Sequence, residues 1–167
     1  MSPAHLHLMF NHLPVIGVPL VAALLAWGLF RRNRDVTRAA LGAAVVIAAL
    51  SYPVFLTGEG AEEQVEDSSW LSEPMVHEHE ARGEAALITT LLVGCLAAFS
   101  LWQSRRDRPV SRRASGVTLA GLGLCAGLFG WTALAGGNIR HDEIRAGPMA
   151  VQPGEAAAGE TAVSDDD

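Results

Sequence analysis

The hydrophobic residues of this chain gather in four long blocks, and they do not recur every three or four positions as they would along an amphipathic soluble helix. The blocks cover residues 13–30, 39–56, 85–102 and 114–135, and none of them contains a charged residue. Each is close to the ~20 residues that an α-helix needs to cross the hydrocarbon core of a bilayer. The pattern therefore predicts an all-α fold, an antiparallel four-helix transmembrane bundle, with residues 1–145 as its single membrane domain.

Charged residues divide between the two predicted sides of the membrane. Nine of the twelve basic residues, all of them arginine, lie in the two short connections at 31–38 and 105–113. The positive-inside rule places both connections in the cytoplasm. Sixteen of the eighteen acidic residues lie on the other side, around the 58–82 loop and in the C-terminal segment. We therefore expect a multi-pass protein of a bacterial inner membrane, with the N- and C-termini on the outer, periplasmic side.

The first apolar block is expected to be a retained span, because the positive charge of a signal peptide precedes its apolar run and here it follows Phe30. The net charge of -6 describes the outer segments and gives no sign of a nucleic-acid partner. The expected partners are membrane lipids and a larger respiratory or electron-transfer complex.

Local signals predict where helices begin, bend and end. Ser2-Pro3 and Ser72-Glu73-Pro74 are typical of helix starts, and Pro14 and Pro19 should kink the first helix. The Gly136-Gly137 pair predicts a left-handed cap after the fourth span. Earlier in that span, Gly123 and Gly127 form a G-x-x-x-G pair, which is typical of a close contact with another helix or a flat cofactor. Residues 146–167 are acidic and poor in large hydrophobic residues, so they predict a disordered tail.

All histidines fall on the predicted outer side, close to the ends of spans. They lie in three separate segments: the start of the first helix, the start of the third and the segment after the fourth. Imidazole is the commonest protein ligand of metals and a frequent ligand of haem iron. The plainer alternative is that interfacial histidines tolerate the headgroup region and pair with nearby glutamates. The six are His5, His7, His12, His77, His79 and His141.

Helical spacing distinguishes between the two histidines of the third helix. His79 shares a face with Ala86 and Thr90, and small residues mark helix contacts in a bilayer, whereas His77 shares its face with Glu80 and should be wet. We therefore predict that His79 points inward.

The preferred hypothesis is a non-catalytic protein that holds b-type haem for electron transfer through His12 and His79. His12 is the choice on the first helix because it lies closest to the apolar span. His7 and His141 would be secondary ligands, and Arg140 could pair with haem propionates.

Two other interpretations remain open. One is a copper- or zinc-binding protein of the outer face, with His12 and His79 again as ligands, because thioether and imidazole groups lie together in this chain. The other is a structural or assembly subunit that binds no cofactor. The run His77-Glu78-His79-Glu80 is no zinc-protease motif, because Gly83 stands where the second histidine would be required.

Several short blocks resemble a bacterial group of small four-helix membrane proteins for which no reaction is established. The resemblance covers about residues 5–145 and implies the fold and the topology, but no activity. The blocks are His7-Leu8-Met9-Phe10-Asn11-His12-Leu13-Pro14, Thr57-Gly58-Glu59, Glu62-Glu63, His79-Glu80 and Gly136-Gly137-Asn138-Ile139-Arg140-His141.

Overall fold

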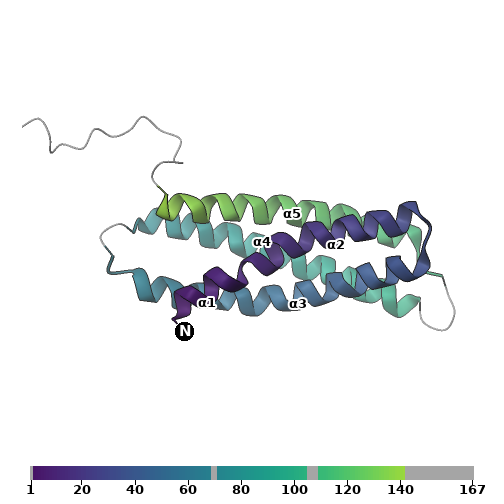
Figure 1. Ribbon diagram of the computed structural model, residues 1–167, viewed down its shortest axis with the longest axis horizontal. Helices are drawn as coiled ribbons and strands as arrows, with labels where there is room; N and C mark the ends of the chain where they lie inside the picture. The colour runs from purple at the N-terminus through teal and green to yellow at the C-terminus, as the bar shows by residue number, and fades with distance from the viewer. Residues whose placement is uncertain (1, 69–70, 105–108, 142–167) are drawn as a thin grey trace, which may run out of the picture.

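The computed structural model describes residues 2–68, 71–104 and 109–141, and these residues form α-helices with no strand (Figure 1). Four helical stretches within them are long and apolar enough to cross a membrane. This confirms the all-α prediction and indicates a multi-pass membrane protein. The helices are α1 (Pro3–Phe10), α2 (His12–Phe30), α3 (Arg34–Val65), α4 (Glu73–Gln103) and α5 (Arg112–Arg140), with α1 and α2 together making the first stretch.

The long helices pack around one shared core. Each of α2, α3 and α4 lies against the next helix in the chain, α5 lies against α2, and α1 lies against the second half of α3. Val18, Leu25, Leu41 and Leu122 are buried at the centre. Large apolar side chains also cover the outside, as Phe30 with 78% of its surface exposed illustrates. A soluble bundle would present charged residues there, so this outer surface suits lipid contact.

The first stretch is broken at Asn11, where α1 ends and α2 begins. Pro14 lies three residues further on and has no backbone N–H to donate to the carbonyl of Phe10, and its ring crowds that carbonyl. The break therefore falls one turn before the proline, as expected for a proline kink. Pro19, by contrast, lies inside a helix that continues without interruption to Phe30.

The segment between the second and third spans is far more helical than predicted. We expected a polar stretch from Gly58 to Trp70, but α3 continues to Val65. The helix start predicted at Ser72-Glu73-Pro74 is confirmed, because α4 begins at Glu73 with Ser72 at its cap position. The glycines at 58 and 60 do not end α3, because they are where α1 packs closely against it. A Cβ atom placed on Gly60 would lie 3.2 Å from the Cβ of Pro3.

The end of α5 also differs from the prediction. The helix runs through Gly136 and Gly137 to Arg140, and no glycine in the described residues adopts a positive φ, so the expected left-handed glycine cap is wrong. Gly123 and Gly127 face outward, with open space where their side chains would be. The predicted disordered tail at 146–167 lies outside the described residues.

Candidate functional site

Two histidines from different helices meet at the end of the bundle where α1 lies beside α3 and α4 begins. The ring centroids of His7 on α1 and His79 on α4 are 6.4 Å apart, and the two ring planes are perpendicular. Both residues are half-buried. They are two imidazoles that different helices bring into ring contact, so we take them as the core of the candidate site.

The imidazole of His79 is held by α5. Its Nδ1 atom lies 3.0 Å from the backbone carbonyl oxygen of Thr132. A carbonyl can only accept, so Nδ1 must carry the proton and donate it. In a neutral ring the lone pair then lies on Nε2, which is the form in which histidine binds a metal.

The imidazole of His7 is held by α3 through the same ring atom. Its Nδ1 lies 3.0 Å from the hydroxyl oxygen of Thr57, and this hydroxyl donates its own proton to the carbonyl oxygen of Val54 at 2.6 Å. Thr57 therefore accepts from His7, which again places the imidazole proton on Nδ1 and the lone pair on Nε2. Metal-binding histidines almost always donate their second ring nitrogen to such a protein acceptor.

Glycines allow the helices to lie close to both rings. A Cβ atom placed on Gly136 of α5 would lie 3.0 Å from Cε1 of His79, which is tighter than ordinary van der Waals contact. A Cβ placed on Gly58 of α3 would lie 3.5 Å from Cε1 of His7. The His79 ring therefore occupies the space that a side chain at 136 would take.

Arg82 fastens α4 to α5 one turn after His79. Its guanidinium lies 4.3 Å from the centre of the Trp131 ring and donates from Nη1 to the Trp131 carbonyl oxygen at 3.3 Å. It also pairs with Glu78 on its own helix. A guanidinium stacked on an aromatic ring is a stabilising contact. Arg82 therefore helps to fix the position of α4, and of His79 on it, along α5.

The separation of the ring centroids and their perpendicular planes are those of an edge-to-face ring contact. In the described residues, no third histidine, cysteine, aspartate or glutamate joins a pair to make a group that could hold a metal ion. Within the described ranges, the candidate metal ligands of this site are therefore the two imidazoles of His7 and His79.

An apolar cavity of about 210 Å³ lies beside the pair, between the start of the first span and α3. Thr57, which accepts from His7, forms part of its wall. The other lining residues are Phe10, Leu13, Leu50, Pro53 and Val54. A flat apolar ligand entering beside His7 would meet this surface.

The remaining candidate residues lie elsewhere. His12 is exposed, and its Nδ1 lies 2.9 Å from the carbonyl oxygen of Leu8 at the end of α1. The side chain of His77 is 76% exposed and lies 3.4 Å from a carboxylate oxygen of Glu80, so this face of α4 is exposed as predicted. Arg140 and His141 lie exposed at the end of α5.

The structure thus brings His79 together with His7, and we find no ring contact between His79 and His12 in the described helices. The inward face predicted for α4 is confirmed, because Ala86 and Thr90 are buried below His79. Sequence reasoning missed Thr57 and Thr132. Thr57 carries a weak signal as a hydroxyl residue at the end of an apolar block, whereas Thr132 acts through its backbone carbonyl, which any residue has.

Comparison of the sequence with protein-family models found no match, and neither curated proteins nor solved structures gave one.

Proposed function

We propose that this protein holds b-type haem for electron transfer, with His7 and His79 as the two residues that would bind it. The observation that supports it is the pair of half-buried imidazoles from different helices, 6.4 Å apart, each held at Nδ1 with its Nε2 lone pair available. Haem supplies four ligand nitrogens of its own and needs only two from the protein. A structural zinc site usually takes four protein ligands and a catalytic one three, so two imidazoles favour haem over zinc.

The surroundings of the pair agree with a porphyrin. The apolar cavity beside Thr57 suits the faces of the macrocycle. Arg140, the last residue of α5, is our candidate for pairing with a haem propionate. A porphyrin needs more room than the cavity gives. The break at Asn11 allows α1 to make that room while α2 stays in the bundle. When bound, haem would supply a one-electron carrier, and the role of the chain is to orient it and to exclude water.

His12 and His141 take supporting roles in this proposal. Both lie near the span ends that carry the pair, and both are exposed, so they would contact the rim of a cofactor or solvent. For His12 or His141 to bind the haem iron, the chain at the junction of α1 and α2 or at the end of α5 would have to change its conformation.

We further propose that the bundle is antiparallel, in a bacterial inner membrane, with both termini in the periplasm. The arginines of the two short connections support this orientation through the positive-inside rule. Haem near the outer surface would then exchange electrons with a periplasmic partner or with a larger membrane complex.

The optical spectrum of the purified protein tests the haem proposal. After expression with ample haem and purification in mild detergent, the protein should show a Soret band and, after dithionite reduction, sharp bands of low-spin b-type haem. Acid acetone should extract the cofactor. Colourless protein containing copper or zinc by elemental analysis would contradict the proposal and favour an outer-face metal site.

A second candidate function is a structural or assembly subunit of a membrane complex. The observation that favours it is the outer face of α5, where Gly116, Gly123, Gly127 and Gly130 have no neighbour within 4 Å. Small residues of this kind allow helices to approach closely in a bilayer. Colourless, metal-free protein that migrates with partner proteins in a mild-detergent native gel would favour this function.

A further inference from the structure

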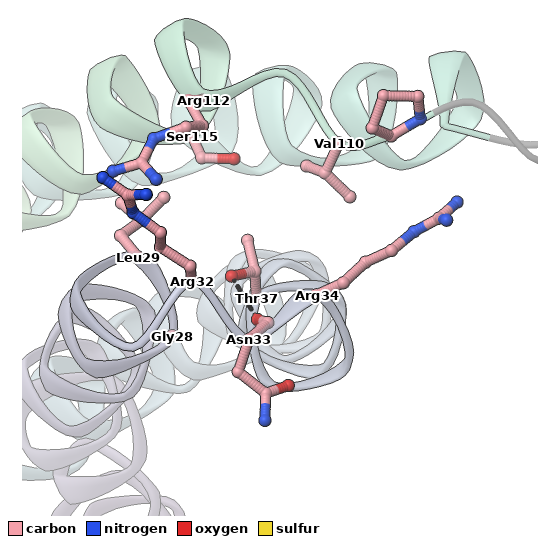
Figure 2. Close-up of a pocket in the computed structure, with 10 residues that line it drawn as sticks. Gly28, Leu29, Arg32, Asn33, Arg34, Thr37, Val110, Arg112 and Ser115 are labelled. Atoms are coloured by element: carbon pink, nitrogen blue, oxygen red, sulfur yellow. Dashed lines mark hydrogen bonds between the residues drawn. The ribbon is translucent and has the colours of Figure 1, made fainter.

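A cavity of about 180 Å³ lies at the opposite end of the bundle from the histidines, where the turn between α2 and α3 faces the start of α5 (Figure 2). Its lining includes three arginines and a serine: Arg32, Arg34, Arg112 and Ser115. The proposed haem site uses none of these residues, so the cavity needs an explanation of its own.

Arg32 is placed at this cavity by an unusual turn. It is the one non-glycine residue in the described chain with a positive φ, at 52°. The amide of Arg32 donates to the carbonyl of Leu29, and that of Asn33 donates to the carbonyl of Gly28. This is the Schellman ending of a helix, in which glycine usually takes the left-handed position. The chain places a long cation there instead, although an L-residue is strained in this conformation.

The start of α5 adds backbone donors that have no acceptor within the helix. The side chain of Ser111 accepts from the amide of Ala114, and its carbonyl accepts from the amide of Ser115. The amides of residues 112 and 113 precede these and have no acceptor within the helix. Together with the helix dipole, such amides favour an anion at a helix N-terminus.

The hydroxyl of Ser115 is the clearest sign of a missing ligand. Seven hydroxyl residues are buried in the described chain, and six of them donate to a carbonyl of their own helix, as Thr118 does to Ala114. Ser115 has no exposed surface and its oxygen has no partner. Figure 2 shows this hydroxyl pointing away from α5 into the space opposite Thr37. An unpaired buried hydroxyl is destabilising, so an absent partner is the simplest account.

Two guanidinium groups approach each other across the wall of the cavity. Figure 2 shows the side chains of Arg32 and Arg112 directed toward one another, from the α2–α3 turn and from α5. In the described part of the chain neither forms a salt bridge with a carboxylate. Like charges that line one cavity repel each other unless an anion lies between or beside them.

We propose that this cavity binds a phosphate group, held by the guanidinium groups of Arg32 and Arg112, the first amides of α5 and the Ser115 hydroxyl. Arginine pairs with phosphate through two parallel hydrogen bonds, and basic pockets between membrane helices commonly take lipid headgroups. The phosphate could belong to an anionic lipid of the adjacent leaflet or to a soluble phosphate. A bound phosphate would link the α2–α3 turn to the start of α5. The proposal does not depend on the haem proposal.

Native mass spectrometry and thermal denaturation in a neutral detergent test the site. The probes are dioleoylphosphatidylglycerol, inorganic phosphate and, as a zwitterionic control, dioleoylphosphatidylcholine. Arg32→Gly removes the guanidinium but also relieves the left-handed strain, so this variant should fold and have an apparent Tm without ligand at or above that of the wild type. Its matched control is Arg31→Gln, because Arg31 stacks on Trp27 and does not line the cavity.

Phosphatidylglycerol or phosphate should raise the apparent Tm of the wild type and of Arg31→Gln. Binding should be about tenfold or more weaker in Arg32→Gly and Arg112→Gln, the loss expected for one charged hydrogen-bonding group. Ser115→Ala should bind more weakly than Thr118→Val, which loses a hydroxyl bonded within its own helix. A response to the lipid alone identifies a headgroup site, and an equal response to phosphate identifies a soluble anion. No Tm shift and no adduct, or an equal loss in Arg31→Gln, would overturn the proposal.

Discussion

Gly136 shows how closely single residues are constrained at the imidazole pair. The His79 ring lies where a side chain at 136 would be, and the carbonyl it bonds belongs to Thr132, one turn earlier on the same helix face. Gly130 on the same helix carries no such constraint, because it has open space beside it. The two positions therefore make a matched pair for substitution.

Gly136→Ala should displace the His79 ring and lower the stability of the protein by about 1–3 kcal/mol, as overpacking of a tight contact does. Gly130→Ala should be neutral or should stabilise the helix by up to about 1 kcal/mol, since alanine is the better helix former. Thermal denaturation in detergent measures both. Equal apparent Tm values for the two variants would mean that His79 does not pack against Gly136.

Residue identity at this site was only partly predictable from the sequence. The inward position of His79 follows from the small residues that share its helix face, and the structure confirms that face. The sequence could not predict which histidine lies next to His79. The relative directions of the His7 and His12 side chains depend on the break between α1 and α2 at Asn11. A helical wheel drawn through both histidines assumes a straight helix, which Pro14 prevents.

At the scale of elements, the packing of α1 against α3 decides whether the imidazoles meet. The break at Asn11 turns α1 onto the outer end of α3, where Gly58 and Gly60 leave room for His7 and Pro3. The apolar blocks predicted four spans, and the described residues contain four helical stretches that are long and apolar enough to cross a membrane. They could not predict that α3 continues to Val65, because the surface that stabilises this polar extension comes from α1.

A disulfide between introduced cysteines measures this docking without any cofactor. Pro3→Cys together with Gly60→Cys, with Cys95 and Cys125 replaced by alanine, should cross-link efficiently under mild oxidation, because the two Cβ positions are adjacent. Adding Pro14→Ala should restore the missing hydrogen bond, straighten the helix and lower the yield. Pro19→Ala is the control, since α2 is continuous at Pro19. An undiminished yield in the Pro14→Ala variant would contradict the role given to the break.

On the scale of the whole molecule, the two ends of the bundle have opposite chemistry. One end carries the histidines and most of the glutamates, and the other carries arginines around the α2–α3 turn and the start of α5. Figure 1 shows the N-terminus and the end of α5 toward the same end of the long axis. Charge placement of this kind sets the orientation that a membrane protein adopts.

Cysteine labelling tests the proposed orientation. In a protein lacking Cys95 and Cys125, a cysteine at Ser2 should react with an impermeant thiol reagent in intact cells, whereas one at Arg31 should react only after the membrane is permeabilised. Both sites lie at helix ends, so reactivity reports the side and not burial. Labelling with the opposite pattern would move every histidine to the cytoplasmic side.

The optical spectrum of single histidine variants tests the central claim most directly. After expression with ample haem, His7→Ala and His79→Ala should each lose the low-spin b-type spectrum, because removing one axial imidazole leaves the iron with an open position. His12→Ala and His77→Ala should keep it, since these side chains are exposed. Loss of the spectrum in His12→Ala with an intact spectrum in His7→Ala would contradict the account, because the ligand on the first stretch would then be the histidine that the structure places away from His79.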